Sequence, residues 1–298
     1  MDMPAAEAAG SYKKYVTSCD LPCLGMLVEQ ATTIITLDYF WAAILGIVQG
    51  LAEFLPISSS GHLALVEHLG MGMPAPASFD VFLHLATLVV VLIYFRRAIF
   101  WYAKNDFKVL LYVVIATIPT GIIGLTCKKY LEALRFSPSM ICVGLLFTAS
   151  FLAAAELRKG ASYQLRDLGW FGAVVIGFCQ SLALAPGISR SGLTISGAMI
   201  CGIDREEAFR FSFILSIPAV AGAVLLHVVE FLRHGGYEAV AQSIAVGPFL
   251  VGFLCAAATG YLALLLLERL VSGGRLVWFA GYCFLAGMAG LIYFNVIA

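Results

Sequence analysis

The chain alternates long apolar runs with short polar connections. Runs of about 20 apolar residues lie near positions 78–95, 107–125, 138–156, 209–231, 244–267 and 276–297. A helix of about 20 apolar residues is long enough to cross the hydrocarbon core of a bilayer. The pattern therefore predicts six full transmembrane helices.

Two further apolar stretches are interrupted by polar residues. They begin near Trp41 and Leu168 and break at Pro56 and at Pro186–Gly187, and each break is followed by serines and a second apolar piece that is too short to cross. Backbone groups freed by proline and glycine inside a membrane must be satisfied by protein or enclosed water, so such breaks line cavities. We predict two re-entrant helical hairpins.

The two interrupted stretches are related in sequence. Residues 46–61 (GIVQGLAEFLPISSSG) align without a gap with residues 177–192 (GFCQSLALAPGISRSG), with eight of 16 positions identical. Three predicted spans lie between the copies, so the second should enter from the opposite face, and the tips should meet near the midplane. The predicted fold is an all-α polytopic membrane domain over residues 39–298, built from inverted repeats at about 39–156 and 168–298.

Composition supports a membrane protein. Of the 298 residues, 61% are hydrophobic and only 12% are charged, about half the charged fraction of a soluble domain. The 18 basic and 18 acidic residues balance, so no nucleic acid partner is expected, and membrane lipids should surround the domain. Residues 1–38 are more polar, and we expect a disordered or interfacial extension there.

The distribution of Lys and Arg predicts the orientation in the membrane. One side receives 11 of them: Arg96, Arg97, Lys104, Lys108, Arg158, Lys159, Arg166, Arg205, Arg210, Arg269 and Arg275. The other side receives six: Lys13, Lys14, Lys128, Lys129, Arg135 and Arg233. The first side should be cytoplasmic, so both termini and the mouth of the first hairpin should face outward.

The remaining basic residue, Arg190, lies at the predicted tip of the second hairpin. A guanidinium inside a membrane costs roughly 2.5 kcal/mol or more, so it normally has an anionic partner and a function. The two tips would bring together a polar set: Gln49, Glu53, Ser58, Ser59, Ser60, His62, Ser189, Arg190, Ser191 and Thr194. A planar guanidinium ringed by hydroxyls and by amides at helix starts suits a phosphate or pyrophosphate group.

The other groups of this set can supply a metal ligand, a nucleophile and a general acid. Glu53 alone would repel a phosphoanion, so it needs Arg190, a divalent cation or a proton beside it, and a glutamate beside pyrophosphate is typical of a site for Mg²⁺ or Ca²⁺. An imidazole at His62 can act as nucleophile or general acid, and the Ser59 hydroxyl can attack once a base takes its proton. The sequence leaves open which of the two is the nucleophile.

The same residues resemble a known family. QGLAEFLPISSSGH (residues 49–62) matches (E/Q)GxxE followed by FLPxSSxGH, and PGISRSGLT (residues 186–194) matches PGxSRSxxT. These are signatures of the undecaprenyl-pyrophosphate phosphatases of the BacA type, and the resemblance runs from about Tyr39 to the C-terminus. It implies hydrolysis of a C55 isoprenoid pyrophosphate at the outer side of the cytoplasmic (inner) membrane, recycling the lipid carrier for cell-wall synthesis. It also implies a link to bacitracin, which competes for the same polyprenyl pyrophosphate.

The resemblance assigns roles to individual residues. Glu53 matches the essential acidic residue, His62 and Ser59 match the catalytic pair, and Arg190 lies in a pyrophosphate clamp with Ser189 and Thr194. Gln49 stands where many members have a second glutamate, so a metal held by Glu53 and Gln49 would depend more on Glu53. The predicted substrate-binding set is completed by Ser58, Gly187 and Ser191, although Ser60 and Ser191 also fit a helix-packing role.

Other interpretations remain open. Inverted repeats with broken helices are also the architecture of carriers, so a transporter or flippase of a polyprenyl phosphate is the alternative function. A structural scaffold would leave Arg190 unexplained. His84 and His227 have no charged motif residue beside them in sequence, and we interpret them as packing residues. Faces rich in small residues are compatible with a homodimer or with internal packing.

Overall fold

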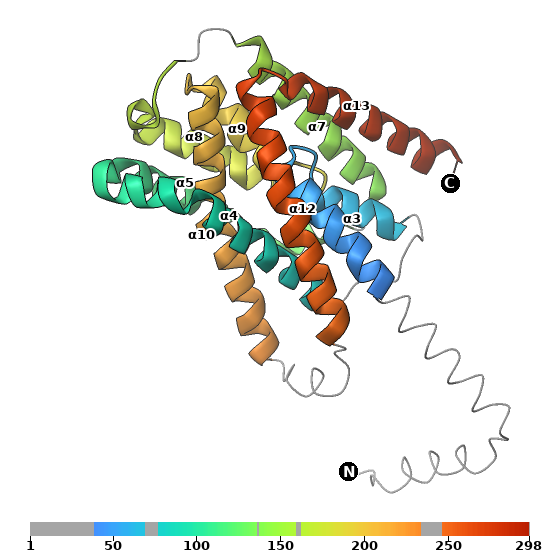
Figure 1. Ribbon diagram of the computed structural model, residues 1–298. Helices are drawn as coiled ribbons and strands as arrows, with labels where there is room; N and C mark the ends of the chain where they lie inside the picture. The colour runs from blue at the N-terminus through green and yellow to red at the C-terminus, as the bar shows by residue number, and fades with distance from the viewer. Residues whose placement is uncertain (1–38, 69–76, 136, 159–161, 234–245, 298) are drawn as a thin grey trace, which may run out of the picture. The chain divides into compact units, whose positions relative to one another are not determined.

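The structure is a computed structural model, and it describes residues 39–68, 77–135, 137–158, 162–233 and 246–297. The extension predicted at residues 1–38 lies outside this part of the chain. The helices are Tyr39–Phe54, α3 (Ser59–His68), α4 (Ala77–Asn105), α5 (Phe107–Thr126), α6 (Lys128–Arg135), α7 (Pro138–Leu157), α8 (Gly169–Leu182), α9 (Arg190–Ile200), α10 (Arg205–Arg233), α12 (Val246–Ser272) and α13 (Leu276–Ile292), with short helices η1 (Leu165–Asp167) and η2 (Tyr293–Ile297) (Figure 1).

Six helices are long and apolar enough to cross a membrane: α4, α5, α7, α10, α12 and α13. They coincide with the six runs predicted from the sequence, and the described residues contain no β-strand. The prediction of an all-α fold with six membrane-spanning helices is confirmed.

The two interrupted stretches form helix–turn–helix pairs. The Tyr39–Phe54 helix ends before Pro56, and α3 begins at Ser59; α8 ends at Leu182, and α9 begins at Arg190. The chain therefore breaks at both places where proline interrupts an apolar run. The re-entrant course of these pairs through a membrane, and the inversion of the repeats, stay predictions.

Each broken helix packs closely against a helix of the other predicted repeat. Gly46 and Gly50, in the first broken helix, lie against backbone atoms of α12 at Gly252 and Ala256. In the second repeat, a Cβ on Gly177 of α8 would lie 2.5 Å from the Ala116 carbonyl oxygen of α5. Glycine permits this close backbone approach. These small residues are therefore used within the chain, and the homodimer stays a prediction.

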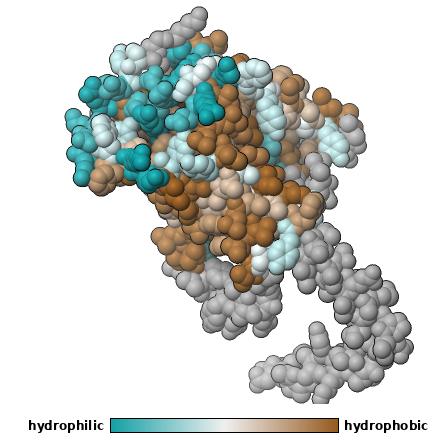
Figure 2. Space-filling view, in the orientation of Figure 1, coloured by the Kyte–Doolittle hydropathy of each residue, from teal (hydrophilic) through white to brown (hydrophobic). Residues whose placement is uncertain are grey.

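Apolar side chains make up the core and much of the visible surface. Four buried aromatic rings, Phe54, Phe95, Phe209 and Phe213, form part of the largest core cluster. Figure 2 shows hydrophilic residues gathered at one end of the visible face, where α4 meets α5, with hydrophobic residues covering much of the remainder. This separation fits a protein whose sides face lipid and whose ends face water.

Candidate active site

A cavity of about 330 Å³ lies where the two interrupted pairs meet. The motif residues that line it are Glu53, Ser58, Ser59, Ser60, Ser189 and Arg190. Residues of α4, α5, α8 and α10 complete its wall, among them Asp80, His84, Thr120, Gln180 and His227. The predicted convergence of the two motifs is therefore present in the structure.

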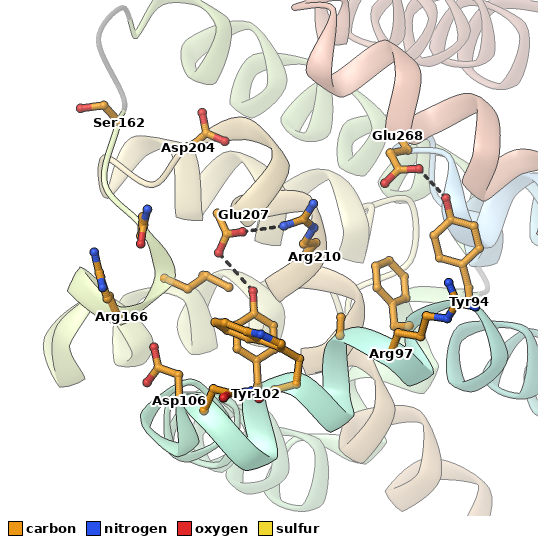
Figure 3. Close-up of a pocket in the computed structure, with 16 residues that line it drawn as sticks. Tyr94, Arg97, Tyr102, Asp106, Ser162, Arg166, Asp204, Glu207, Arg210 and Glu268 are labelled. Atoms are coloured by element: carbon orange, nitrogen blue, oxygen red, sulfur yellow. Dashed lines mark hydrogen bonds and ion pairs between the residues drawn. The ribbon is translucent and has the colours of Figure 1, made fainter.

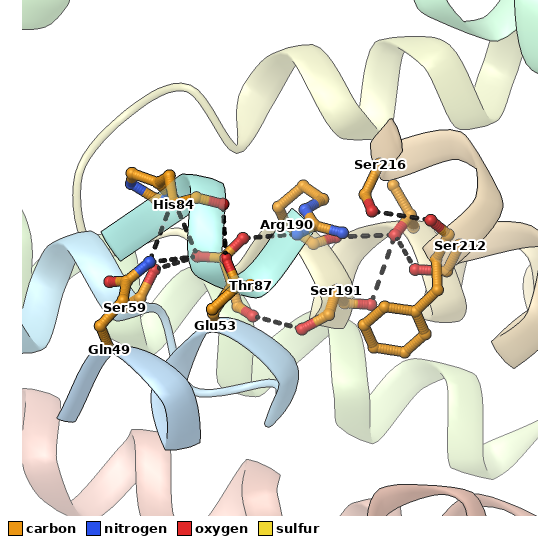
Figure 4. Close-up of polar contacts among 12 residues, drawn as sticks. Gln49, Glu53, Ser59, His84, Thr87, Arg190, Ser191, Ser212 and Ser216 are labelled. Atoms are coloured by element: carbon orange, nitrogen blue, oxygen red, sulfur yellow. Dashed lines mark hydrogen bonds and ion pairs between the residues drawn. The ribbon is translucent and has the colours of Figure 1, made fainter. Parts of the chain in front are cut away.

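The Glu53 carboxylate is the centre of the polar contacts in this cavity (Figure 4). Its Oε1 atom accepts a hydrogen bond from Arg190 Nη2 at 2.5 Å, and its Oε2 atom accepts one from the Ser59 hydroxyl at 2.7 Å. Gln49 Nε2 donates to the same Oε2 atom at 3.2 Å. A buried carboxylate with a cation and two further donors has the partners that an isolated buried charge lacks.

The first turn places Ser59 beside Glu53 through an unusual backbone conformation. Ser58 has φ of 72°, in the left-handed region that side chains rarely adopt. Its Oγ accepts a hydrogen bond from Gly61 N at 3.3 Å, which caps the start of α3. A strained residue directly before a candidate nucleophile is typical of functional sites.

The second turn places Arg190 at the first position of α9. Gly187, with φ of 85°, reverses the chain, and a Cβ there would collide with the Ile141 backbone. Ser189 Oγ then caps α9 by accepting a hydrogen bond from Gly192 N at 3.1 Å. Gly187 does not line the cavity, so its contribution here is to the turn and not to the lining.

One side of the Arg190 guanidinium is available to an anion. Nη2 binds Glu53, whereas Nη1 is buried and has no hydrogen-bond partner among the described residues. The guanidinium carbon lies 5.9 Å from the centroid of the Phe213 ring, which supports the group from the other side. A buried guanidinium nitrogen without a partner is expected to take a phosphate oxygen.

Several predicted residues do not face the cavity. Ser191 Oγ donates to the Leu55 carbonyl at 3.4 Å and lies 3.3 Å from Ser189 Oγ. Thr194 Oγ1 donates to the Arg190 carbonyl and forms a hydrogen bond with Ser212 Oγ of α10. Both side chains are buried. In this structure they hold α9 in position, and direct binding of substrate by them stays a prediction.

His62 is also held away from the Glu53 and Arg190 pair. Its Nδ1 atom donates to the Ser58 carbonyl at 2.8 Å, and its Nε2 atom forms a 2.7 Å hydrogen bond with the hydroxyl of Tyr282 in α13. His62 is not among the residues that line the cavity. The structure does not bring His62 into contact with Glu53 or Arg190, contrary to the expectation from the sequence, and its catalytic role stays a prediction.

The histidine that does reach the carboxylate is His84 of α4. Its Nδ1 atom lies 3.0 Å from Gln49 Nε2 and 3.6 Å from Glu53 Oε2 (Figure 4). The interpretation of His84 as a packing residue was therefore wrong. The sequence carried a weak signal, since a histidine in an intramembrane segment is a functional candidate by default.

A divalent cation such as Mg²⁺ or Ca²⁺ would need oxygen ligands near Glu53. Gln49 Oε1 is buried without a hydrogen-bond partner among the described residues, and it lies on the side chain that contacts Glu53. No group of three His, Cys, Asp or Glu side chains in the described part of the chain is arranged to hold a metal ion. A hard cation here would take at most one carboxylate and one amide oxygen from the protein and its other ligands from substrate phosphates and water, so the cation stays a prediction.

A second cavity, of about 1110 Å³, is larger but lacks the motif residues (Figure 3). Two of its carboxylates have hydrogen-bond partners: Glu207 accepts from Arg210 and from the Tyr102 hydroxyl, and Glu268 accepts from the Tyr94 hydroxyl. Several of its residues, including Arg97, belong to the side predicted to be cytoplasmic. Size alone does not make it the active site, because no candidate nucleophile and base meet in it.

Contacts between buried aromatic rings connect the larger cavity with the cavity that contains Arg190. Phe95, in the wall of the larger cavity, stacks on Phe213 with centroids 5.8 Å apart, and Phe213 lies under Arg190. Phe54 contacts the same Phe213 ring.

Comparisons with known proteins agree with the motif residues. The family model described as bacitracin resistance protein BacA matches residues 42–289. A protein named undecaprenyl-diphosphatase from Carboxydothermus hydrogenoformans is 40% identical over 257 residues, covering 86% of this chain and 97% of the relative. Proteins with the same name from Geobacter sulfurreducens and Korarchaeum cryptofilum are 39% and 38% identical, covering 86% and 83% of this chain and 98% and 96% of the relatives.

Proposed function

The chain belongs to the bacitracin resistance protein BacA family, and we propose that it is a membrane phosphatase that hydrolyses undecaprenyl pyrophosphate to undecaprenyl phosphate and inorganic phosphate. The observation that carries this proposal is the Ser59 hydroxyl donating to the Glu53 carboxylate, beside a guanidinium with an unpartnered Nη1. These are the nucleophile, base and anion-binding group that phosphoryl transfer needs.

We propose Ser59 as the nucleophile. Arg190 Nη1 would bind a phosphate oxygen and hold the terminal phosphorus near Ser59 Oγ. As a bond forms between Ser59 Oγ and this phosphorus, the hydroxyl proton passes to Glu53 Oε2. The bond from phosphorus to the bridging oxygen breaks, and its electron pair leaves with the lipid monophosphate. Water then attacks the phosphoserine, the bond from phosphorus to Ser59 Oγ breaks, and Oγ takes back the proton held by Glu53. Inorganic phosphate leaves with the oxygen and protons of the water.

A divalent cation, Mg²⁺ or Ca²⁺, is part of the proposal. Glu53 and Gln49 Oε1 would hold it together with substrate oxygens. When bound, such a cation neutralises phosphate charge and makes the phosphorus easier to attack.

The cellular role follows from the reaction and from the orientation expected from the charged loops. We propose that the protein is in the cytoplasmic (inner) membrane with its site opening outward, where it returns the lipid carrier to cell-wall synthesis. Bacitracin, by sequestering the same pyrophosphate, would compete with the protein for substrate. The transporter alternative has no support from the relatives, and a carrier has no evident need for a hydroxyl paired with a carboxylate.

The test is phosphate release by the purified full chain in detergent from polyprenyl pyrophosphate with Mg²⁺ or Ca²⁺ present, with Arg190→Ala as the control. We expect release by the wild type and not by the variant. Movement of a labelled polyprenyl phosphate between vesicle leaflets, with no phosphate released, would overturn the proposal in favour of a carrier.

A further inference from the structure

Two imidazoles line the cavity that contains Glu53 and Arg190, and His84 is the one that lies beside Glu53. It lies on α4, 31 residues from Glu53 in sequence, and its side chain is 37% exposed while lining the cavity. The reaction proposed above gives it no role.

The contacts of Gln49 determine the tautomer of His84. As oriented, the Gln49 amide donates from Nε2 to Glu53 Oε2 at 3.2 Å and to His84 Nδ1 at 3.0 Å. A reversed amide would place its oxygen against the Glu53 carboxylate, where two acceptors would repel. His84 Nδ1 is therefore an acceptor, and in a neutral imidazole the proton then resides on Nε2.

The Nε2–H group is available for a ligand. Among the described residues, no hydrogen bond involves His84 Nε2, whereas Nδ1 is held by Gln49. Arg190 contacts Glu53 through Oε1, and the His84 ring lies beside Oε2. A phosphoanion in the cavity would therefore meet two donors: Arg190, which binds Glu53 Oε1, and His84, which lies beside Glu53 Oε2.

We propose that His84 is a catalytic residue that donates a hydrogen bond from Nε2 to a phosphate oxygen of the substrate. This inference rests on the proposed phosphatase function. In this role the imidazole transfers no proton; its N–H stabilises the charge that shifts onto the phosphate oxygens as the bridging bond breaks. Removing one such preorganised donor typically lowers kcat by about 10²- to 10³-fold.

Three variants of the purified full chain test the role. We expect His84→Ala to lower kcat for farnesyl pyrophosphate by about 10²-fold. His84→Gln should recover to within about tenfold of wild type, because its amide also presents an N–H donor. The control is Leu92→Ala, which truncates an exposed side chain of the same helix α4 that lines neither cavity; it should leave kcat unchanged.

The outcomes separate this inference from the proposed function. If the wild type hydrolyses the substrate and His84→Ala is equally active, the role of His84 is wrong while the phosphatase proposal stands. If His84→Gln is as inactive as His84→Ala, and thermal unfolding shows that both variants are folded, the hydrogen-bond role is also wrong.

A binding measurement tests the contact even if the wild type releases no phosphate. Its ligand is farnesyl methylenediphosphonate, which cannot be cleaved at its bridge. We expect about tenfold weaker binding by His84→Ala, and equal binding would overturn the inference.

Discussion

The tips of the two repeats share one helix cap but differ in their turns and in their chemistry. Ser58 and Ser189 occupy aligned positions, and each caps the following helix through the N–H three residues later. At two other aligned pairs the copies differ: Glu53 against Leu184, and Ser59 against Arg190. The carboxylate and the hydroxyl come from the first copy, and the guanidinium comes from the second. The site therefore needs contact between the two copies and also needs the residues at which their sequences differ.

The turns also differ in where they place a left-handed residue. The first turn has it at Ser58, directly before Ser59, whereas the second has it at Gly187, three residues before Arg190. Glycine adopts this conformation without strain, and serine does not. The strain is therefore confined to the copy that carries the hydroxyl and the carboxylate.

The largest effect should come from removing the charge that only the second repeat supplies. Arg190→Ala leaves Glu53 buried without its cation, which should cost about 3–5 kcal/mol of stability and lower kcat/KM on the order of 10³-fold or more. Thermal unfolding and phosphate release would measure both. Glu53→Gln in the same background should restore much of the stability but no activity. A stable, active Arg190→Ala protein would remove the charge pair from the mechanism.

Loss of the hydroxyl that only the first repeat supplies should be nearly as damaging to activity. Ser59→Ala removes the proposed nucleophile, so kcat should fall by about 10³-fold or more, while the fold persists because Arg190 still binds Glu53. Rapid acid quenching should trap phosphoserine at Ser59 in the wild type. An acid-labile phosphohistidine at His62 would show that the other residue predicted from the motif is the nucleophile.

The aligned glutamines provide a test of the cation. Excess EDTA should abolish phosphate release. Gln49→Ala should raise the Mg²⁺ concentration for half-maximal activity by about tenfold or more, because the Gln49 amide contacts Glu53. The matched change Gln180→Ala should leave this metal requirement unchanged, because the Gln180 amide donates to Thr120 instead. Full activity in EDTA would remove the metal from the proposal.

The smallest effects should come from the features that the two copies share. Ser58→Ala and Ser189→Ala each remove a helix cap, which should lower the free energy of unfolding by about 1 kcal/mol. Equal losses would indicate that the caps are equivalent, as the aligned hydrogen bonds imply. A much larger loss for one variant would show that the copies differ in scaffold as well as in chemistry.

The sequence by itself determined the six membrane-length helices, the positions of the two breaks and the need of Arg190 for an anionic partner. Helix length and proline act locally, and a charge in an apolar chain needs a partner, so these features follow from residue order and composition. The chemistry of the residues indicated His62 and Ser59 as candidate nucleophiles, and the match to the family motifs added that they correspond to the catalytic pair.

Only the tertiary structure decided which histidine faces the cavity. His62 follows the serine turn closely in sequence. Its ring nevertheless forms hydrogen bonds with the Ser58 carbonyl and with the hydroxyl of Tyr282, 220 residues away in sequence. His84 reaches Gln49 because of the rotation of α4 about its axis. Asp80, His84 and Thr87 are spaced i, i+4 and i+7 and so mark one polar face of α4, but only the packing of the helices places that face beside Gln49 and Glu53.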